Sequence, residues 1–179
     1  MSAFVGPLSM ICGVLAVAGI AKMISPRPTR QAMALIGLPI PALGVRAMGL
    51  AEVALAVATV VFGGTILVAL VGALHVGFAL VVVALLRRPG GASCGCFGSL
   101  DTPISRGHLV ANLVSAAVAF AALDAPGIAS VLADQPGGGV AYLLLIATGA
   151  ASAVAALTLL PRLRPGAAAP PVFSLRASR

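Results

Sequence analysis

Charged and aromatic residues are scarce in this chain. Charged residues make up 8% of its 179 residues and aromatic residues 4%, with one tyrosine and no tryptophan. A soluble domain of this length would carry about 25% charged residues, so there is too little polar surface to coat a globule in water. The 60% hydrophobic content and the mean hydropathy of +1.14 indicate that lipid is the solvent for most of the chain.

The basic residues do not indicate nucleic-acid binding. The net charge of +7 comes from 11 Lys and Arg against 4 Asp and Glu. However, the basic residues are not interleaved with aromatic side chains, as they are in proteins that bind single-stranded nucleic acid. In a membrane protein, Lys and Arg near helix ends act as orientation signals. We therefore expect a lipid bilayer, and no nucleic acid, as a partner.

Five apolar segments are long enough to cross a membrane, because a spanning helix needs about 20 predominantly apolar residues. Residues 1–11 contain no Lys or Arg for a signal peptide, so the first segment is expected to remain as an anchor. Pro26 and Pro28 end that segment, and Gly63-Gly64 divides a long apolar stretch into a helical hairpin. A short interfacial helix is expected around 30–36. The expected spans are 3–23, 43–62, 65–86, 104–123 and 140–160.

These segments predict an all-α integral membrane protein, a four-helix transmembrane bundle with a fifth, peripheral transmembrane helix. The corresponding division is a four-helix domain at 1–124, a loop and fifth helix at 125–161, and a disordered basic tail at 162–179. Small residues would let the helices approach closely; they include Gly13, Gly19, Gly49, Gly72 and Gly77.

A five-span arrangement places all 11 Lys and Arg residues on one side of the membrane. The loop between the last two spans, on the other side, carries only Asp124 and Asp134 as charged residues. Cytoplasmic loops attract Lys and Arg. We therefore expect a multi-pass protein of the cell (inner or plasma) membrane with its N-terminus outside and its C-terminus inside.

Two of the three cysteines lie one residue apart in the glycine-rich connection between the third and fourth spans. Cys94 and Cys96 flank Gly95, whereas Cys12 lies in the first apolar run and is expected to be a buried hydrophobe. Cysteines at this spacing can close a small, strained disulfide ring, and strain makes a disulfide more oxidising. Nearby arginines would favour the nucleophilic thiolate. Cys94 and Cys96 are therefore the candidate catalytic residues for thiol–disulfide exchange.

Two other interpretations of these cysteines stay open. The pair could be two small loop residues that form a static local disulfide. A metal site is the other alternative, since His108 lies twelve residues beyond Cys96. The paired Cys spacing that is typical of zinc sites is missing, so we expect no metal.

Three ionisable residues, Lys22, Glu52 and His75, fall inside the apolar segments. Glu52 lies roughly 13 Å into the second span at about 1.5 Å per residue. A lone carboxylate there costs at least ~2.5 kcal/mol, so it should face the bundle, be paired or be protonated, and Lys22 is the expected partner. Such a pair is either a lock between two helices or part of a proton or substrate path. His75 is expected to be a hydrogen-bonded packing residue rather than a ligand or proton relay.

Several of these polar residues fall in the same half of the membrane. Lys22, Arg46 and Asn112 share that half with the cysteine loop, and Glu52 and His75 lie behind them. The arrangement predicts a polar cavity that opens beside the thiols. Asn112 and Ser115 on the fourth span are also expected to form hydrogen bonds between helices.

The combination resembles the MauE family of methylamine-utilisation membrane proteins, which are distant relatives of the DoxX proteins. The likeness covers residues 4–123 and rests on three features: Ala21-Lys22 at the end of the first span, Glu52 in the second, and Ser93-Cys94-Gly95-Cys96-Phe97-Gly98 after the third. The resemblance implies a part in maturing the disulfide-rich small subunit of methylamine dehydrogenase, beside a thioredoxin-like protein, MauD. It also implies Cys94 and Cys96 as the redox pair and Lys22 and Glu52 as family-typical polar residues.

We therefore predict a membrane protein that supports thiol–disulfide redox chemistry or maturation of a partner protein, as a membrane thiol–disulfide oxidoreductase. The expected partner is a thioredoxin-like protein of the MauD type, and a quinone is a further candidate redox partner by analogy with other membrane thiol oxidases.

Disulfide formation for exported proteins belongs on the outer face, whereas the charge rule places Cys94 and Cys96 inside. Either the cysteine loop works from the inside or the orientation is inverted, and the charge segregation favours the first. Electrons would then come from a cytoplasmic donor, or the cysteine pair is regulatory.

Two rival functions remain. The first is a small-molecule or proton-coupled transporter that uses Glu52 and His75 as a proton path. The second is a non-catalytic subunit that assembles with a partner in the membrane. A role for Cys94 and Cys96 in exchange separates the redox function from both.

Overall fold

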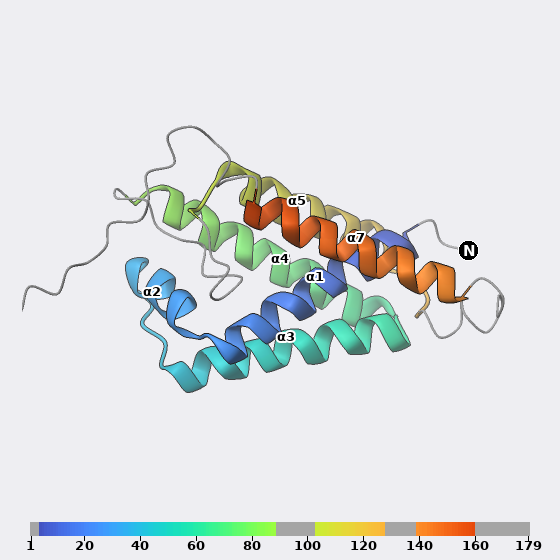
Figure 1. Cartoon of the computed structure of the whole chain (residues 1–179), viewed down its shortest axis with the longest axis horizontal. Coiled ribbons are helices and arrows are strands. Elements are labelled where there is room, and N and C mark those ends of the chain that lie inside the picture. Colours follow the sequence, from blue (N-terminus) through green and yellow to red (C-terminus); the bar gives the residue numbers. More distant parts are fainter. Residues whose placement is uncertain (1–3, 89–102, 128–138, 160–179) are drawn as a thin grey trace, which may run out of the picture.

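The computed structural model describes residues 4–88, 103–127 and 139–159. Cys94, Cys96 and the basic tail lie outside these ranges. The described part is built of α-helices, which Figure 1 shows as an elongated bundle. The helices are α1 (Val5–Ile24), α2 (Arg27–Leu35), α3 (Ala42–Phe62), α4 (Thr65–Leu86), α5 (Arg106–Ala121) and α7 (Gly139–Leu159).

Four of these helices, α1, α3, α4 and α7, are long and apolar enough to cross a membrane. The fourth predicted span is present as α5, which has 16 residues. At about 1.5 Å per residue, α5 is roughly 24 Å long, shorter than a hydrocarbon core of about 30 Å. The all-α membrane bundle that the sequence predicts is confirmed.

Proline and glycine set the helix boundaries. The predicted hairpin is confirmed, because α3 and α4 meet at Gly63 and Gly64, which have φ angles of +65° and +92°. Residues with a side chain rarely adopt these backbone angles, so the turn requires glycine. The Gly64 amide also donates a 3.4 Å hydrogen bond to the Ala125 carbonyl oxygen, which ties the turn to the segment after α5.

The short helix α2 begins earlier than the sequence predicts, at Arg27 instead of residue 30. Proline is well tolerated in the first turn of a helix, where its missing N–H has no intrahelical partner in any case. Pro28 therefore lies inside the first turn of α2 instead of excluding the chain from it. The helix ends before Gly37, whose φ angle is +84°, a common helix terminator.

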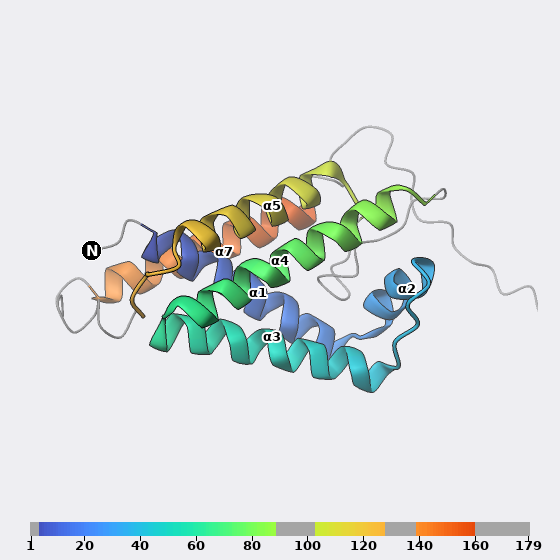
Figure 2. The same ribbon diagram turned by 180° about the vertical axis from the view of Figure 1, so that it is seen from behind.

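Helix α1 is the centre of the bundle and packs against α3, α5 and α7, while α4 packs against α5 and α3. Figure 2 shows α4 and α5 side by side on the face opposite α7. Only 6% of the most apolar stretch of α7 is buried, against 39% for α1. Helix α7, which corresponds to the fifth predicted span, is therefore peripheral, as predicted. Cys12 of α1 is 1% exposed and is a free thiol in the core, which confirms its expected role as a buried hydrophobe.

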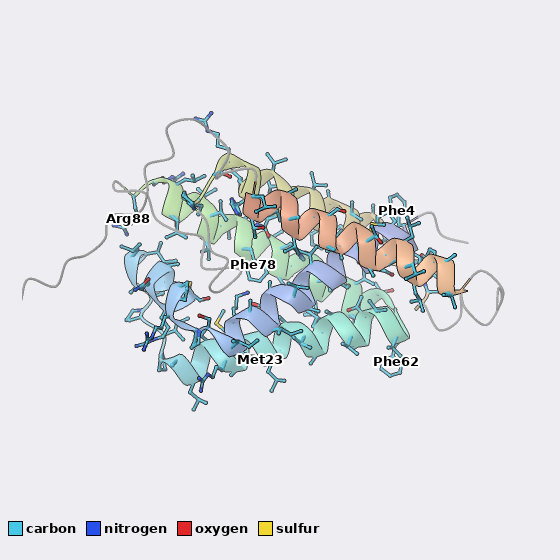
Figure 3. All side chains as sticks on the ribbon, viewed as in Figure 1. Phe4, Met23, Phe62, Phe78 and Arg88 are labelled. Atoms are coloured by element: carbon cyan, nitrogen blue, oxygen red, sulfur yellow. The ribbon has the colours of Figure 1, made fainter. Side chains whose placement is uncertain are left out.

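The two ends of the bundle differ in charge. All seven basic residues of the described ranges lie at or near the end formed by the C-termini of α1 and α4, the N-termini of α3 and α5, and helix α2; this is called the basic end below. Figure 3 shows Arg88 at this end and Phe62 at the other, where the Gly63-Gly64 turn and Asp124 also lie. The predicted one-sided placement of Lys and Arg is confirmed for these residues.

Candidate functional site

Helices α1 and α3 cross at two glycines. A Cβ atom placed on Gly19 would lie 2.5 Å from the Gly49 carbonyl oxygen, and one placed on Gly49 would lie 2.5 Å from the Gly19 carbonyl oxygen. Real Cβ atoms essentially never approach another heavy atom so closely. Only glycine fits at both positions, and the two backbones approach as small residues allow in membrane helix pairs.

The same crossing brings Lys22 and Glu52 together. Each charged residue follows a crossing glycine by three positions, so it lies on the same face of its helix. The helices run in opposite directions, and Lys22 therefore packs over Gly49 while Glu52 packs over Gly19. A Cβ on either glycine would lie 3.2 Å from the Cβ of the charged residue that it faces. The missing glycine side chains thus provide the space for an ion pair.

The predicted pairing of Lys22 with Glu52 is confirmed. Lys22 Nζ donates a 2.7 Å hydrogen bond to Glu52 Oε2, and each side chain is 3% exposed. Neither charge would be tolerated alone among these apolar helices, because an unpaired buried ion is strongly destabilising. The second carboxylate oxygen, Glu52 Oε1, is buried and accepts no hydrogen bond from the described part of the chain.

An aromatic side chain of α4 covers the other side of the ammonium group. Lys22 Nζ lies 5.2 Å from the centroid of the Phe78 ring, within the range of a cation–π contact. Phe78 projects from α4 into the interior beside α1 (Figure 3). Its ring meets the His75 ring edge to face, with centroids 5.8 Å apart. Lys22 is therefore shared between the Glu52 carboxylate and an aromatic face.

His75 is tied to its own helix. Its Nδ1 atom lies 2.9 Å from the Val71 carbonyl oxygen. A carbonyl oxygen can only accept, so Nδ1 carries the hydrogen, and in the neutral ring Nε2 is a hydrogen-bond acceptor. The side chain is 5% exposed. The expectation of a buried, hydrogen-bonded histidine is confirmed.

A cavity of about 60 Å³ lies among α1, α4, α5 and α7. Its lining is mostly apolar, but five polar side chains contribute to it: Lys22, His75, His108, Asn112 and Ser115. A space of this size has room for a few water molecules. Because α5 begins with His108 in its first turn, the cavity extends toward the basic end.

The predicted polar cavity is therefore confirmed in part. Lys22, His75 and Asn112 share it as expected. The placement of Arg46 is wrong, since Arg46 lines a separate hollow at the basic end. Glu52 contributes to an apolar groove between α3 and α4 and meets the cavity only through its bond to Lys22.

The sequence profile of the MauE family, described as methylamine utilisation protein MauE, matches residues 3–125. The chain belongs to the MauE family. This membership makes it a methylamine-utilisation membrane protein, and the matched range contains Lys22, Glu52, His75, Cys94 and Cys96. Helix α7 lies beyond the match. Comparisons with curated proteins and with solved structures gave no match.

Two members of the polar cluster in this MauE-family chain were not predicted as such. The sequence gives no signal for Phe78, because an aromatic residue in an apolar helix is ordinary, although it lies three residues from His75 and hence on the same face. The sequence offers His108 only as a metal ligand. It is 3% exposed, its Nδ1 lies 3.0 Å from Ser105 Oγ, and its carbonyl oxygen accepts a 2.8 Å hydrogen bond from Asn112 Nδ2.

The spacing of the α5 polar residues is the signal that would have found His108. His108, Asn112 and Ser115 follow one another at four and three positions, so they lie on one face of the helix. Within the described ranges, no three His, Cys, Asp or Glu side chains come close enough together to hold a metal ion. The three side chains of α5 all line the cavity in the bundle interior.

The Phe78→Leu variant tests the cation–π contact. The substitution keeps an apolar side chain but removes the ring, and we expect a loss of about 0.5–2 kcal/mol in the free energy of unfolding. The measurement is an SDS titration in mixed micelles, followed by far-UV circular dichroism. Phe62→Leu is the matched control, because Phe62 is 76% exposed at the opposite end. Losses of equal size in the two variants would show that the contact between the Phe78 ring and Lys22 adds nothing to the free energy of unfolding.

Proposed function

We propose that this MauE-family protein supports thiol–disulfide exchange for a partner protein through Cys94 and Cys96. The observation that carries the proposal is the position of the described residues on either side of the connection that holds them. The described chain continues past the end of α4 at Leu86 to Arg88 and resumes at Pro103 before α5, both at the basic end. The cavity shared by Lys22, His75 and Asn112 extends toward the same end, since His108 of α5 also lines it. Membership of the family adds support for a role in methylamine utilisation.

The proposed exchange needs two thiols and a partner disulfide. One cysteine thiolate attacks a sulfur of the partner disulfide, which forms a mixed disulfide and releases one partner thiolate. The second cysteine then attacks the mixed disulfide. The Cys94–Cys96 bond forms, the partner leaves as a dithiol, and two electrons have passed to it. The reverse sequence oxidises the partner and reduces the cysteine pair.

In this proposal the polar cluster has a structural role, because it holds the helices together. The Lys22–Glu52 pair is buried at the crossing of α1 and α3, and the glycines opposite it fix the two backbones at close range. A transporter with a proton path through Glu52 and His75 has less support, because Lys22 and Phe78 lie between those two side chains. We therefore propose the pair as a lock between helices.

The proposed partner is a thioredoxin-like protein of the MauD type, and the proposed substrate is the disulfide-rich small subunit of methylamine dehydrogenase. The charge rule favours the basic end as the cytoplasmic side, with the N-terminus of the chain outside. Reducing equivalents would then reach Cys94 and Cys96 from a cytoplasmic donor. A quinone is the proposed acceptor if electrons leave through the lipid.

Single cysteine variants test the exchange. Removal of the second-acting cysteine prevents resolution of the mixed disulfide, so we expect either Cys94→Ser or Cys96→Ser to accumulate a covalent complex with a thioredoxin-like protein. The measurement is non-reducing electrophoresis with mass spectrometry of the trapped band. The double variant should give no such band. Cys12→Ala is the control, because the Cys12 thiol is buried in the core, and it should leave trapping unchanged.

Two results would contradict the proposal. Normal maturation of methylamine dehydrogenase in cells that carry the Cys94→Ser/Cys96→Ser variant would remove the cysteines from the function. Failure of both single variants to trap any thiol partner would do the same. A membrane-impermeant thiol reagent, applied to intact and to opened cells, tests the side: labelling only in opened cells is expected for a cytoplasmic location.

A further inference from the structure

Three arginines line one hollow at the basic end. Arg27 and Arg30 belong to α2 and Arg46 to the second turn of α3, and the hollow of about 390 Å³ lies where the end of α1 meets these two helices. All three arginine side chains are exposed. A second hollow of about 360 Å³ beside α2 is also lined by Arg27 and Arg30. Neither Lys22 nor Glu52 lines this surface.

No carboxylate of the described residues neutralises these arginines. The only two acids in those ranges are Glu52, which is bound to Lys22, and Asp124, which accepts a hydrogen bond from Thr65 at the opposite end. The N-terminus of α2 faces the same hollow and has no acidic residue in its first turn and no side-chain cap. The partial positive charge of a helix N-terminus therefore adds to the three guanidinium charges.

The geometry of Arg30 favours a phosphate-bearing ligand. Its Nε donates a 3.3 Å hydrogen bond to the carbonyl oxygen of Ile40, a lining residue of the second hollow, and this bond restrains the side chain. The two terminal nitrogens remain as donors, and a guanidinium group matches the oxygen spacing of phosphate. Ser25 contributes a hydroxyl-bearing side chain to the same lining.

The surroundings of the hollow favour a ligand that also has an apolar part. Ile24 lines the hollow and is 77% exposed, and Leu43, next to the lining residue Ala42, is also 77% exposed. These side chains lie at the ends of membrane-spanning helices, where headgroups meet acyl chains. A ligand with a negative headgroup and apolar tails satisfies both features, because basic pockets at the ends of transmembrane helices bind anionic headgroups.

We propose that the hollow lined by Arg27, Arg30 and Arg46 binds the phosphate headgroup of an anionic phospholipid, with the acyl chains against Ile24 and Leu43. The guanidinium groups and the α2 N-terminus hold the phosphate. The lipid anchors α2 against the start of α3 at the membrane boundary. The site does not depend on the cysteines or on the proposed exchange.

The test is lipid binding to the full-length protein in detergent after removal of bound lipid. Phosphatidylglycerol and phosphatidylcholine with the same acyl chains are titrated separately, and the lipid-bound fraction is read by native mass spectrometry. We expect phosphatidylglycerol to bind much more tightly. The Arg27→Gln/Arg30→Gln/Arg46→Gln variant should weaken its binding about 100-fold, on the basis of the attraction of each basic residue for anionic lipid.

The charge-matched control is Arg87→Gln/Arg88→Gln/Arg106→Gln, which removes three arginines from the same end but none from the hollow. It should bind phosphatidylglycerol like the unmodified protein. Equal weakening in both triple variants would overturn the proposal in favour of general charge attraction. Equal affinity for the two lipids would also overturn it.

Two further measurements complete the test. Millimolar inorganic phosphate should leave phosphatidylglycerol bound, and displacement by phosphate would overturn the lipid assignment in favour of a free-phosphate site. The single variants Arg27→Gln and Arg46→Gln, with far-UV circular dichroism as a check of folding, should each weaken binding about 5-fold. No weakening in either folded single variant would contradict the site.

Discussion

Replacement of Glu52 with alanine is expected to lower the free energy of unfolding by about 3–5 kcal/mol, the usual loss when one partner of a buried ion pair is removed. The Lys22 side chain, which is 3% exposed in the unmodified protein, would lose its ion-pair partner and keep the Phe78 ring as a cation–π contact. A buried cation–π contact is worth about 2 kcal/mol, which is less than this cost. The measurement is an SDS titration in mixed micelles, followed by far-UV circular dichroism.

The Lys22→Met/Glu52→Leu double variant separates the cost of an unpaired charge from a general need for this pair. Because it replaces both ions with apolar groups of similar size, we expect most of the lost stability to return. Asp124→Ala is the control for removal of an acid, since Asp124 is exposed at the opposite end. A double variant as unstable as Glu52→Ala, or a Glu52→Ala loss no larger than that of Asp124→Ala, would show that charge pairing does not hold α1 to α3.

The Gly49→Ala variant is expected to destabilise the protein by about 3 kcal/mol, at the upper end of the usual range for overpacking. The added Cβ would meet the Gly19 carbonyl oxygen at 2.5 Å. That obstacle is backbone and cannot rotate aside, so α1 and α3 must separate. The separation also stretches the Lys22–Glu52 bond, which lies one turn away.

Gly77→Ala is the matched control for this substitution. Gly77 is also in the middle of a spanning helix, but a Cβ there would have no neighbour within 4 Å among the described residues. Alanine has the higher helix propensity, so this variant should gain up to about 1 kcal/mol. The two variants are thus expected to have effects of opposite sign. Equal effects in the SDS titration would contradict the close crossing.

The helix boundaries were largely predictable because proline and glycine act locally. Gly63 and Gly64 supply the positive φ angles of the hairpin, and the end of α1 at Ile24 precedes Pro26 and Pro28. Gly77 was also among the glycines expected to let helices approach closely, but no described residue comes within 4 Å of a Cβ placed there. Glycine allows close approach but does not require it, so only the packing decides which glycines are used.

The rotation of each helix was harder to predict. The spanning helices are apolar on all sides, so hydrophobic periodicity does not mark the buried face. Glu52 and Lys22 were paired correctly because a buried charge needs a partner and few were available. Arg46 was placed correctly in depth but wrongly in direction. It precedes Glu52 by six residues, which at about 3.6 residues per turn puts the two on different faces of α3.

The reciprocal contact of Lys22 over Gly49 and Glu52 over Gly19 has a consequence for how the protein moves. If α1 slid along α3 by one helical turn, about 5.4 Å, Lys22 and Glu52 would no longer lie over glycines. Each would clash with a larger residue of the facing helix, and the ion pair would break. Piston-like travel of these helices is therefore blocked in both directions at once. Helix α7 is less constrained, because it packs against α1 with little of its surface covered by the described residues, and we expect any relative movement of the helices there.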